Sequence, residues 1–328
     1  MQTRSLTALA LSAAVLAGAA TLPATLAAAA GSRPAVYQLP GDPVLDGAGG
    51  SKFEGIGYDA RTQRFYVSET TGGEIHRGHL QSGTAAEWLR GDGTDDRWTA
   101  RGVTVDSQGR VYVAGGPNGI DHPGAPDLWV YDRTGRLLAA LRTGVANAFV
   151  NDVAVGPDGA AYFTNSNAPQ VFRVAERHGH WSVRTWADAT GTIPVRTGFN
   201  LGGIVVAPDR QSLVVAQGNV GRLWRFDLRS GGASPVDTGS ANLVNADGLV
   251  LRGDQLWVVR NFSRVLSTLR ISADARAATL TSEQPTDPDR LFTTAKLAQD
   301  RLLLVDSKFD EPVGLPPYEV VALTPLRR

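Results

Sequence analysis

One short pattern occurs six times in the sequence, and this repetition limits the possible folds more than any other feature. Each copy joins an alternating apolar stretch to a second apolar stretch through a short turn. In the clearest copy, residues 149–165, Pro157-Asp-Gly159 forms the turn, and glycine supplies the positive φ that a hairpin turn needs. The first residues of the copies are 47, 50, 51, 45 and 46 positions apart: Glu54, Arg101, Asn151, Gly202, Asp247 and Thr293.

Six units of this size predict a β-propeller, because each unit is too small to bury its own apolar faces without its neighbours. We therefore predict an all-β fold, a six-bladed β-propeller with four-stranded antiparallel blades. Short apolar stretches at 35–39 and 318–323 flank the repeats. We expect these N- and C-terminal strands to complete one blade together and so close the ring, which hides an edge that would otherwise be open.

The first thirty residues have the pattern of a secretory signal peptide. Arg4 carries a positive charge, residues 6–20 are apolar, and the stretch ends in small residues at 26–30. A membrane anchor is the alternative, but Pro23 and the alanine-rich end argue against it. We predict a signal peptide at 1–30, a single propeller domain at 31–328, and a protein that is secreted and extracellular.

The charge balance and the lack of cysteine exclude several function classes. The chain has 32 basic and 32 acidic residues, which gives no reason to expect nucleic acid or, after signal cleavage, a membrane as partner. It has no cysteine, so disulfides, thiolate metal sites and cysteine nucleophiles are excluded. We expect a monomer whose partner is a small-molecule substrate.

The repeat alignment also predicts where a functional site lies. The first residue of each copy stands at the head of an innermost strand, so the six side chains should meet at one mouth of the central channel. The carboxylates of Glu54 and Asp247 and the amide of Asn151 are oxygen ligands, which suit a hard cation such as Ca²⁺ better than zinc or copper. Alternatively, these polar residues only begin strands and satisfy backbone groups.

Four short stretches carry a resemblance to a known family. They are Phe53-Glu-Gly55, Val150-Asn-Asp-Val153, residues 200–209 (NLGGIVVAPD) and Ala246-Asp-Gly-Leu249. In this order and spacing, the chain resembles the SMP-30/gluconolactonase/luciferin-regenerating-enzyme family over residues 35–325. It is more distantly similar to paraoxonases and strictosidine synthases, and it most resembles a branch of secreted actinobacterial proteins.

The resemblance implies one divalent metal at the channel mouth, held by Glu54, Asn151 and Asp247, with Asp247 also acting as general base. Calcium is the ion we expect, with zinc, manganese and magnesium as alternatives. The family's fourth ligand is missing, because Gly202 stands where an asparagine is expected. Asn200 could reach the site instead, or a water could fill the gap.

Three residues, Arg101, Asn200 and Asp152, are assigned to substrate binding. Arg101 departs from the family pattern, and its guanidinium could bind an acidic or hydroxylated substrate or replace the metal by pairing with Glu54 or Asp247. Asp152 would orient its neighbours from behind the site. The sequence thus indicates a secreted metal-dependent hydrolase of a lactone or ester. The alternative is a degenerate, non-catalytic extracellular propeller that binds a small molecule, glycan or protein.

Overall fold

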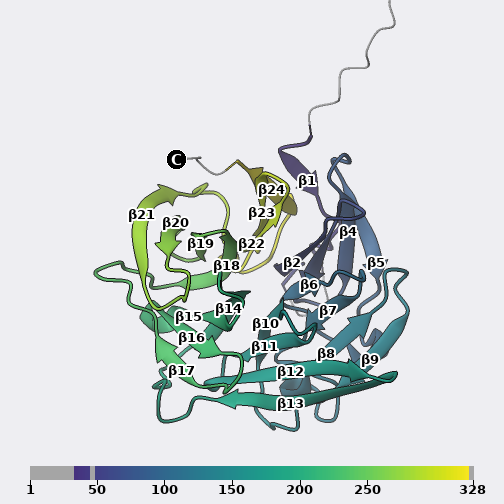
Figure 1. Ribbon diagram of the computed structural model, residues 1–328. Coiled ribbons are helices and arrows are strands. Elements are labelled where there is room, and N and C mark those ends of the chain that lie inside the picture. Colours follow the sequence, from purple (N-terminus) through teal and green to yellow (C-terminus); the bar gives the residue numbers. More distant parts are fainter. Residues whose placement is uncertain (1–32, 45–48, 325–328) are drawn as a thin grey trace, which may run out of the picture. The chain divides into compact units, whose positions relative to one another are not determined.

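Six four-stranded antiparallel sheets follow one another along the chain and surround a common centre (Figure 1). The computed structural model describes residues 33–44 and 49–324, and all of these sheets lie within them. The predicted signal peptide at 1–30 lies outside the described residues. Within those residues, no helix has the length and apolar character that a membrane crossing needs.

The first three blades follow the chain order from the innermost strand outward. Blade 1 consists of β2 (Phe53–Asp59), β3 (Arg64–Glu69), β4 (Ile75–His79) and β5 (Ala85–Leu89). Blade 2 consists of β6 (Val103–Val105), β7 (Val111–Ala114), β8 (Leu128–Tyr131) and β9 (Leu137–Leu141). Blade 3 consists of β10 (Val150–Val155), β11 (Ala161–Asn165), β12 (Gln170–Arg177) and β13 (His180–Asp188).

Two of the remaining blades repeat this order, and the last is built from both ends of the fold. Blade 4 consists of β14 (Leu201–Val206), β15 (Ser212–Gln217), β16 (Arg222–Asp227) and β17 (Ala233–Pro235). Blade 5 consists of β18 (Ala246–Arg252), β19 (Gln255–Arg260), β20 (Val265–Ile271) and β21 (Ala278–Pro285). Blade 6 consists of β22 (Phe292–Ala298), β23 (Arg301–Asp306), β24 (Glu319–Leu323) and β1 (Val36–Gln38).

The few helical turns are short and lie in connections between strands. They are the 3-10 turns η1 (Thr94–Asp96) and η2 (Gly218–Val220) and the single-turn helix α1 (Asn118–Asp121). The predicted turn at Pro157 to Gly159 is present, and Gly159 has a φ of 76°, in the left-handed region that favours glycine. The all-β, six-bladed prediction is confirmed.

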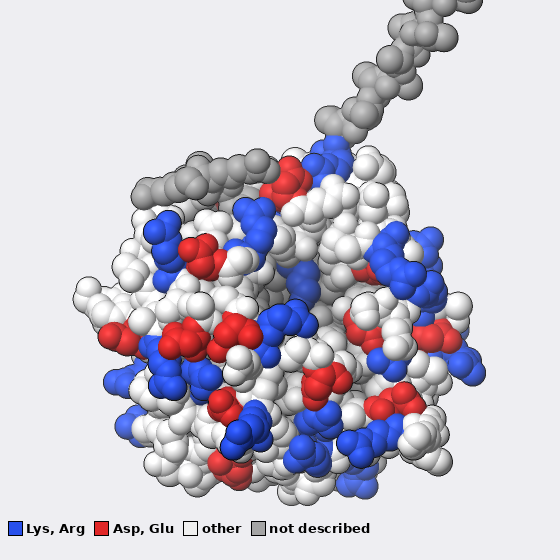
Figure 2. Space-filling model, viewed as in Figure 1, with Lys and Arg blue, Asp and Glu red and all other residues white. Residues whose placement is uncertain are grey.

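The core lies between neighbouring blades, as expected when no single blade can bury its own faces. Val214 and Ala216 of β15 pack in one cluster with Leu256 and Val258 of β19 in the next blade. The innermost strands of neighbouring blades also contact one another all round the ring. On the face shown in Figure 2, positive and negative side chains are interspersed, and the centre is hollowed where the innermost strands meet.

The closing strand β1 pairs antiparallel with β24, as predicted, and Tyr37 then joins this blade to the first one. The Tyr37 hydroxyl donates to the carbonyl of Leu80 at 3.0 Å and accepts from Arg301 of β23 at 2.7 Å. Its ring meets Phe65 of β3 edge-on, with the centroids 5.0 Å apart. Because the side chain is fully buried, it joins the first and last blades.

We therefore expect Tyr37→Ala to lower the free energy of unfolding by about 3–5 kcal/mol, the cost of emptying a buried aromatic site. Tyr37→Phe should cost about 1–3 kcal/mol, because the Leu80 carbonyl loses its donor. Urea unfolding of the two variants measures both values. Leu137→Ala, at an exposed position of β9, is the control, and equal stability of Tyr37→Ala and Leu137→Ala would contradict a closing role for Tyr37.

Candidate functional site at the channel mouth

A bulge recurs near the start of the innermost strands and produces the channel mouth. In five blades, two residues of the innermost strand oppose a single residue of the second strand. The bulged pairs are 54–55, 151–152, 202–203, 247–248 and 293–294. Such a bulge re-aims side chains locally and is frequent beside active sites. The first residue of each pair is the repeat position identified from the sequence.

The second residue of the pair faces the neighbouring blade, which approaches too closely for a side chain in several blades. A Cβ on Gly55 would lie 2.2 Å from the carbonyl oxygen of Arg101, and one on Gly203 would lie 2.0 Å from that of Asp247. Gly248 meets Thr294 of the next blade in the same way. These glycines allow the inner strands to pack edge to edge, so the mouth stays narrow.

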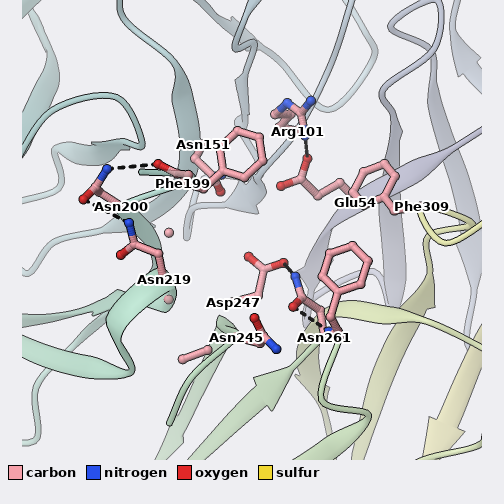
Figure 3. Close-up of a pocket in the computed structure, with 15 residues that line it drawn as sticks. Glu54, Arg101, Asn151, Phe199, Asn200, Asn219, Asn245, Asp247, Asn261 and Phe309 are labelled. Carbon is pink, nitrogen blue, oxygen red and sulfur yellow. Dashed lines mark hydrogen bonds and ion pairs between the residues drawn. The ribbon is translucent and has the colours of Figure 1, made fainter. Parts of the chain in front are cut away.

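Five of the six predicted positions line one cavity at this end of the channel: Glu54, Arg101, Asn151, Gly202 and Asp247. The cavity has a volume of about 270 Å³ and takes its walls from several blades (Figure 3). Thr293 is the exception. Its side chain is fully buried, and its hydroxyl donates to the carbonyl of Glu54 at 3.1 Å, so it joins blade 6 to blade 1.

Arg101 is held in place by four groups. Its guanidinium forms an ion pair with Glu54 Oε2 and donates to the carbonyl oxygen of Gly116. The same guanidinium lies 4.5 Å from the ring centre of Phe149 and 6.0 Å from that of Phe309. The pairing of Arg101 with Glu54, one of the two roles considered for it, is therefore present, and Glu54 Oε1 is left free of this pair (Figure 3).

Asp247 faces the same cavity and is held by an asparagine from its own blade. Asn261 Nδ2 donates to Asp247 Oδ2 at 2.8 Å, and Asn261 Oδ1 accepts from the amide of Phe262 at 2.6 Å (Figure 3). Asp247 Oδ1 lies 3.6 Å from the position a Cβ would take on Gly202. This second carboxylate oxygen is therefore directed toward the gap that the missing side chain leaves.

Burial and mutual repulsion disfavour the charged forms of both carboxylates. Burial raises the pKa of Asp247 well above its ordinary value, and the nearby charge of Glu54 raises it further, while the Asn261 hydrogen bond opposes the shift. Burial also raises the pKa of Glu54, although the charge and hydrogen bond of Arg101 act in the opposite direction. The cavity thus holds two carboxylates and one compensating guanidinium.

Asp152, the second residue of the bulge in blade 3, does not line the cavity. Its Oδ1 accepts from the amide of Val153 at 2.8 Å, and its Oδ2 accepts from the amide of Ile204 at 3.2 Å, which joins blades 3 and 4. Burial raises its pKa, and the positive charge of Lys296 opposes that shift. Lys296 reaches Thr104 of blade 2 from blade 6, at 3.4 Å, so its ammonium lies across the channel.

Asn200 borders the cavity, but its amide is occupied by its own loop and by blade 4. Its Oδ1 accepts from the amide of Arg196 at 2.9 Å and from Gln217 Nε2 at 3.1 Å. Its Nδ2 donates to the carbonyls of Ser166, Arg196 and Gly198 at 3.0–3.3 Å. The structure therefore places Asn200 as a support of the cavity wall, and its role in substrate binding stays a prediction.

Sequence reasoning missed three asparagines that also line the cavity, Asn219, Asn245 and Asn261. All three lie in connections rather than at the repeat positions, so the alignment of the repeats did not select them. Asn219 donates to Asn200 Oδ1 at 3.2 Å, while its own Oδ1 is buried without a protein partner. The available signal was position, because each lies within two residues of the end of β15 or β19 or of the start of β18.

Solved structures with this fold include proteins of different function. A gluconolactonase of Xanthomonas campestris superimposes with a TM-score of 0.59 at 18% identity, over 84% of this chain and 86% of that one. Regucalcin of Agrobacterium tumefaciens, a calcium-binding protein, gives 0.56 at 19% identity, over 84% and 94%. Virginiamycin B lyase of Staphylococcus aureus gives 0.56 at 16% identity, over 78% of each chain. No family model and no curated protein matches the sequence.

The raised pKa of Asp247 predicts a stability effect with a definite sign. In the absence of divalent cations, the folded state holds a proton on Asp247 more tightly than the unfolded chain does. Stability should therefore fall as the pH rises from the ordinary aspartate range, about 4, toward neutrality. Asp247→Asn keeps an acceptor for Asn261 and removes the charge.

We expect Asp247→Asn to be more stable than the unaltered protein at pH 7 in chelator, by about 0.5–2 kcal/mol, as for other substitutions that relieve a strained site. Urea unfolding at pH 5 and pH 7 measures the difference. The gain should shrink at pH 5, where Asp247 is neutral in a larger share of the folded molecules. An equal effect at both pH values would show that Asp247 does not carry the predicted electrostatic cost.

Proposed function

We propose that this chain is a secreted hydrolase that opens a lactone or an ester at the channel mouth with the aid of one divalent cation. The observation that carries the proposal is a pair of carboxylates, the buried Glu54 and the half-buried Asp247, which share one cavity with a single guanidinium. The leader pattern at 1–30 supports an extracellular location. We propose that the mature chain acts as a monomer on a small molecule.

The residues present fit a hard divalent cation in their chemistry. Glu54 Oε1, Asp247 Oδ1 and the amide oxygen of Asn151 are the donors that would hold it, and Ca²⁺ accepts such oxygen ligands with a variable coordination number. Among the described residues, no three His, Cys, Asp or Glu side chains come together as a metal cluster. The site therefore depends on an amide as third donor, which suits Ca²⁺ or Mg²⁺ better than Zn²⁺.

When bound, such an ion supplies Lewis-acid chemistry at a carbonyl oxygen. The chain's own residues have separate tasks. The Asp247 carboxylate, which Asn261 holds through Oδ2, would take a proton from the attacking water and return it to the alkoxide oxygen that leaves when the ester bond breaks. The Asn151 amide, which has no side-chain partner in the described structure, can donate to the oxygen on which negative charge develops. Arg101 presents its remaining N–H groups to a polar substituent of the substrate.

The second candidate is a binding propeller without catalysis. Two observations favour it: Arg101 already neutralises Glu54, and Gly202 contributes no side chain to the cavity. In that case the guanidinium takes the place of the ion, and the cavity binds a small molecule, glycan or protein group. The fold does not decide between the two, since one fold can support many functions.

Metal dependence tests the proposal. The Tm of a protein of residues 31–328 is measured in chelator and then with Ca²⁺, Mg²⁺, Mn²⁺ or Zn²⁺. Ester and lactone hydrolysis are measured under the same conditions. An ion that binds only the folded state adds about 2.7 kcal/mol at a hundredfold excess over its Kd. We expect a rise in Tm and hydrolysis that chelator abolishes, both lost in Asp247→Asn. No shift and no hydrolysis with any ion would favour the binding propeller.

Gly202 offers a gain-of-function test of the same site. A Cβ at this position meets nothing closer than Asp247 Oδ1 at 3.6 Å, so Gly202→Asn can add an amide oxygen beside that carboxylate. We expect it to tighten cation binding by about tenfold, equivalent to about 1.4 kcal/mol. Titration calorimetry with Ca²⁺ measures the change.

The neighbouring glycine provides the matched control. A Cβ on Gly203 would lie 2.0 Å from the carbonyl oxygen of Asp247, so Gly203→Asn should destabilise the fold and should not improve cation binding. A Gly202→Asn protein that folds normally and binds cations no better than the unaltered chain would contradict the proposed metal position.

A further inference from the structure

We infer that the substrate carries an apolar group next to its polar reacting group, an inference that rests on the proposed function and specifies its substrate class. Three phenylalanines from three connections line the cavity at its opening: Phe199, Phe262 and Phe309. Phe199 and Phe262 are 60% and 54% exposed, which is unusual for phenylalanine side chains. Figure 3 shows the rings of Phe199 and Phe309 at the border of the cavity.

The apolar exposure is concentrated at one end of the propeller. Among the described residues, nine large apolar side chains are exposed, and all except Leu137 lie in connections on the same end as the cavity. Connections at the other end, such as 132–136 and 207–211, contain none of the nine. Exposed apolar side chains that gather around one polar cavity indicate a ligand-binding surface, whereas single scattered ones need no explanation.

The rings belong to the cavity structurally and are not chance surface residues. Phe199 packs on the buried Phe149 with ring centroids 5.0 Å apart, and Phe149 in turn lies under the Arg101 guanidinium. Phe309 approaches Arg101 from another blade. Phe262 follows Asn261 directly, and its amide donates to the side chain that holds Asp247. These three phenylalanines, which we call the apolar rim, are thus each connected to Arg101 or Asp247 in the polar floor of the cavity.

The size of the cavity separates the two parts of the substrate. A volume of about 270 Å³ lies at the lower limit of small-molecule sites, so the floor has room for a compact head such as a lactone ring or an ester group. Any longer substituent must leave the cavity across the phenylalanine rim. An alkyl or aromatic substituent would bury those rings, whereas a polyhydroxylated one would lose hydration there without gaining hydrogen bonds.

A chain-length series tests this inference. The unaltered protein is assayed for kcat/KM on p-nitrophenyl esters from acetate to decanoate, on alkyl-substituted δ-lactones, and on glucono-δ-lactone. We expect kcat/KM to increase by about fourfold for each methylene group that the rings cover, and then to level off. Phe262→Ser and Phe199→Ser should reduce the ratio of long-chain to short-chain kcat/KM. Leu137→Ser, at the other end of the propeller, should leave the ratio unchanged.

Binding measurements separate this inference from the proposed hydrolase activity. Titration calorimetry with unsubstituted and alkyl-substituted δ-lactams, which resist hydrolysis, should show tighter binding of the longer analogue in the unaltered protein and a smaller difference in Phe262→Ser. This result without hydrolysis of any ester would support the inferred apolar substituent and contradict the proposed hydrolase activity. Hydrolysis with no dependence on chain length would contradict the inferred apolar substituent and support the proposed hydrolase activity.

A lipid surface is the competing occupant of the rim. If phosphatidylcholine vesicles bind the unaltered protein but not Phe262→Ser, while neither hydrolysis nor lactam binding depends on chain length, the rim contacts a membrane and the inference is wrong. If vesicles do not bind and chain length has the expected effect, the substrate assignment holds.

Discussion

The channel mouth depends on one irregularity, the two-for-one bulge near the start of the innermost strands. In a regular strand, successive side chains point to opposite faces of the sheet. Two neighbouring residues could then not be placed so that one faces the channel and the other the adjoining blade. At the bulge, Glu54 faces the cavity while Gly55 leaves space for the backbone of Arg101. The hydroxyl of Ser68, which opposes this pair, accepts from the Gly55 amide and donates to the Arg101 carbonyl. The residues that shape the cavity in blade 1 are therefore also those that join blade 1 to blade 2.

The six repeat positions have diverged within this common frame. Thr164 repeats the role of Ser68, since its hydroxyl accepts from the backbone amide of Asp152 and donates to the carbonyl of Gly202 in the next blade. The hydroxyl of Thr293 also donates to a carbonyl of the next blade, that of Glu54, and this side chain does not line the cavity. Positions that keep a carboxylate or an amide facing the channel hold it without a complete set of protein partners. The candidate site thus lies where inter-blade hydrogen bonds leave side-chain oxygens free.

The sequence was sufficient for the blade count and most of the cavity floor, because both follow from the period of one repeat, and for the closing strand, because apolar stretches flank the repeats at both ends. It was not sufficient for the walls. Asn261 and Phe262 lie in the connection between β19 and β20, outside the repeated strand pattern, and only folding brings them beside Asp247. The occupied amide of Asn200 was equally hidden, since its partners Arg196 and Gln217 belong to a loop and a neighbouring strand. The period of the repeat predicts where the strands lie, whereas the meeting of loops at the cavity depends on tertiary contacts.

The charges in the channel bear on the choice between enzyme and binding module. The charge of Asp152 raises the pKa of Glu54 and of Asp247, and the charge of Glu54 also raises the pKa of Asp247. Arg101 and Lys296 are the cations that lower the pKa values of these carboxylates. Three negative and two positive groups leave one negative charge if all are ionised, and burial makes that state costly. A proton on Asp247 would remove the charge but also the general base. In the proposed hydrolase, a bound divalent cation would offset the negative charge and favour the ionised form of Asp247, whereas a binding module without catalysis would need no ion.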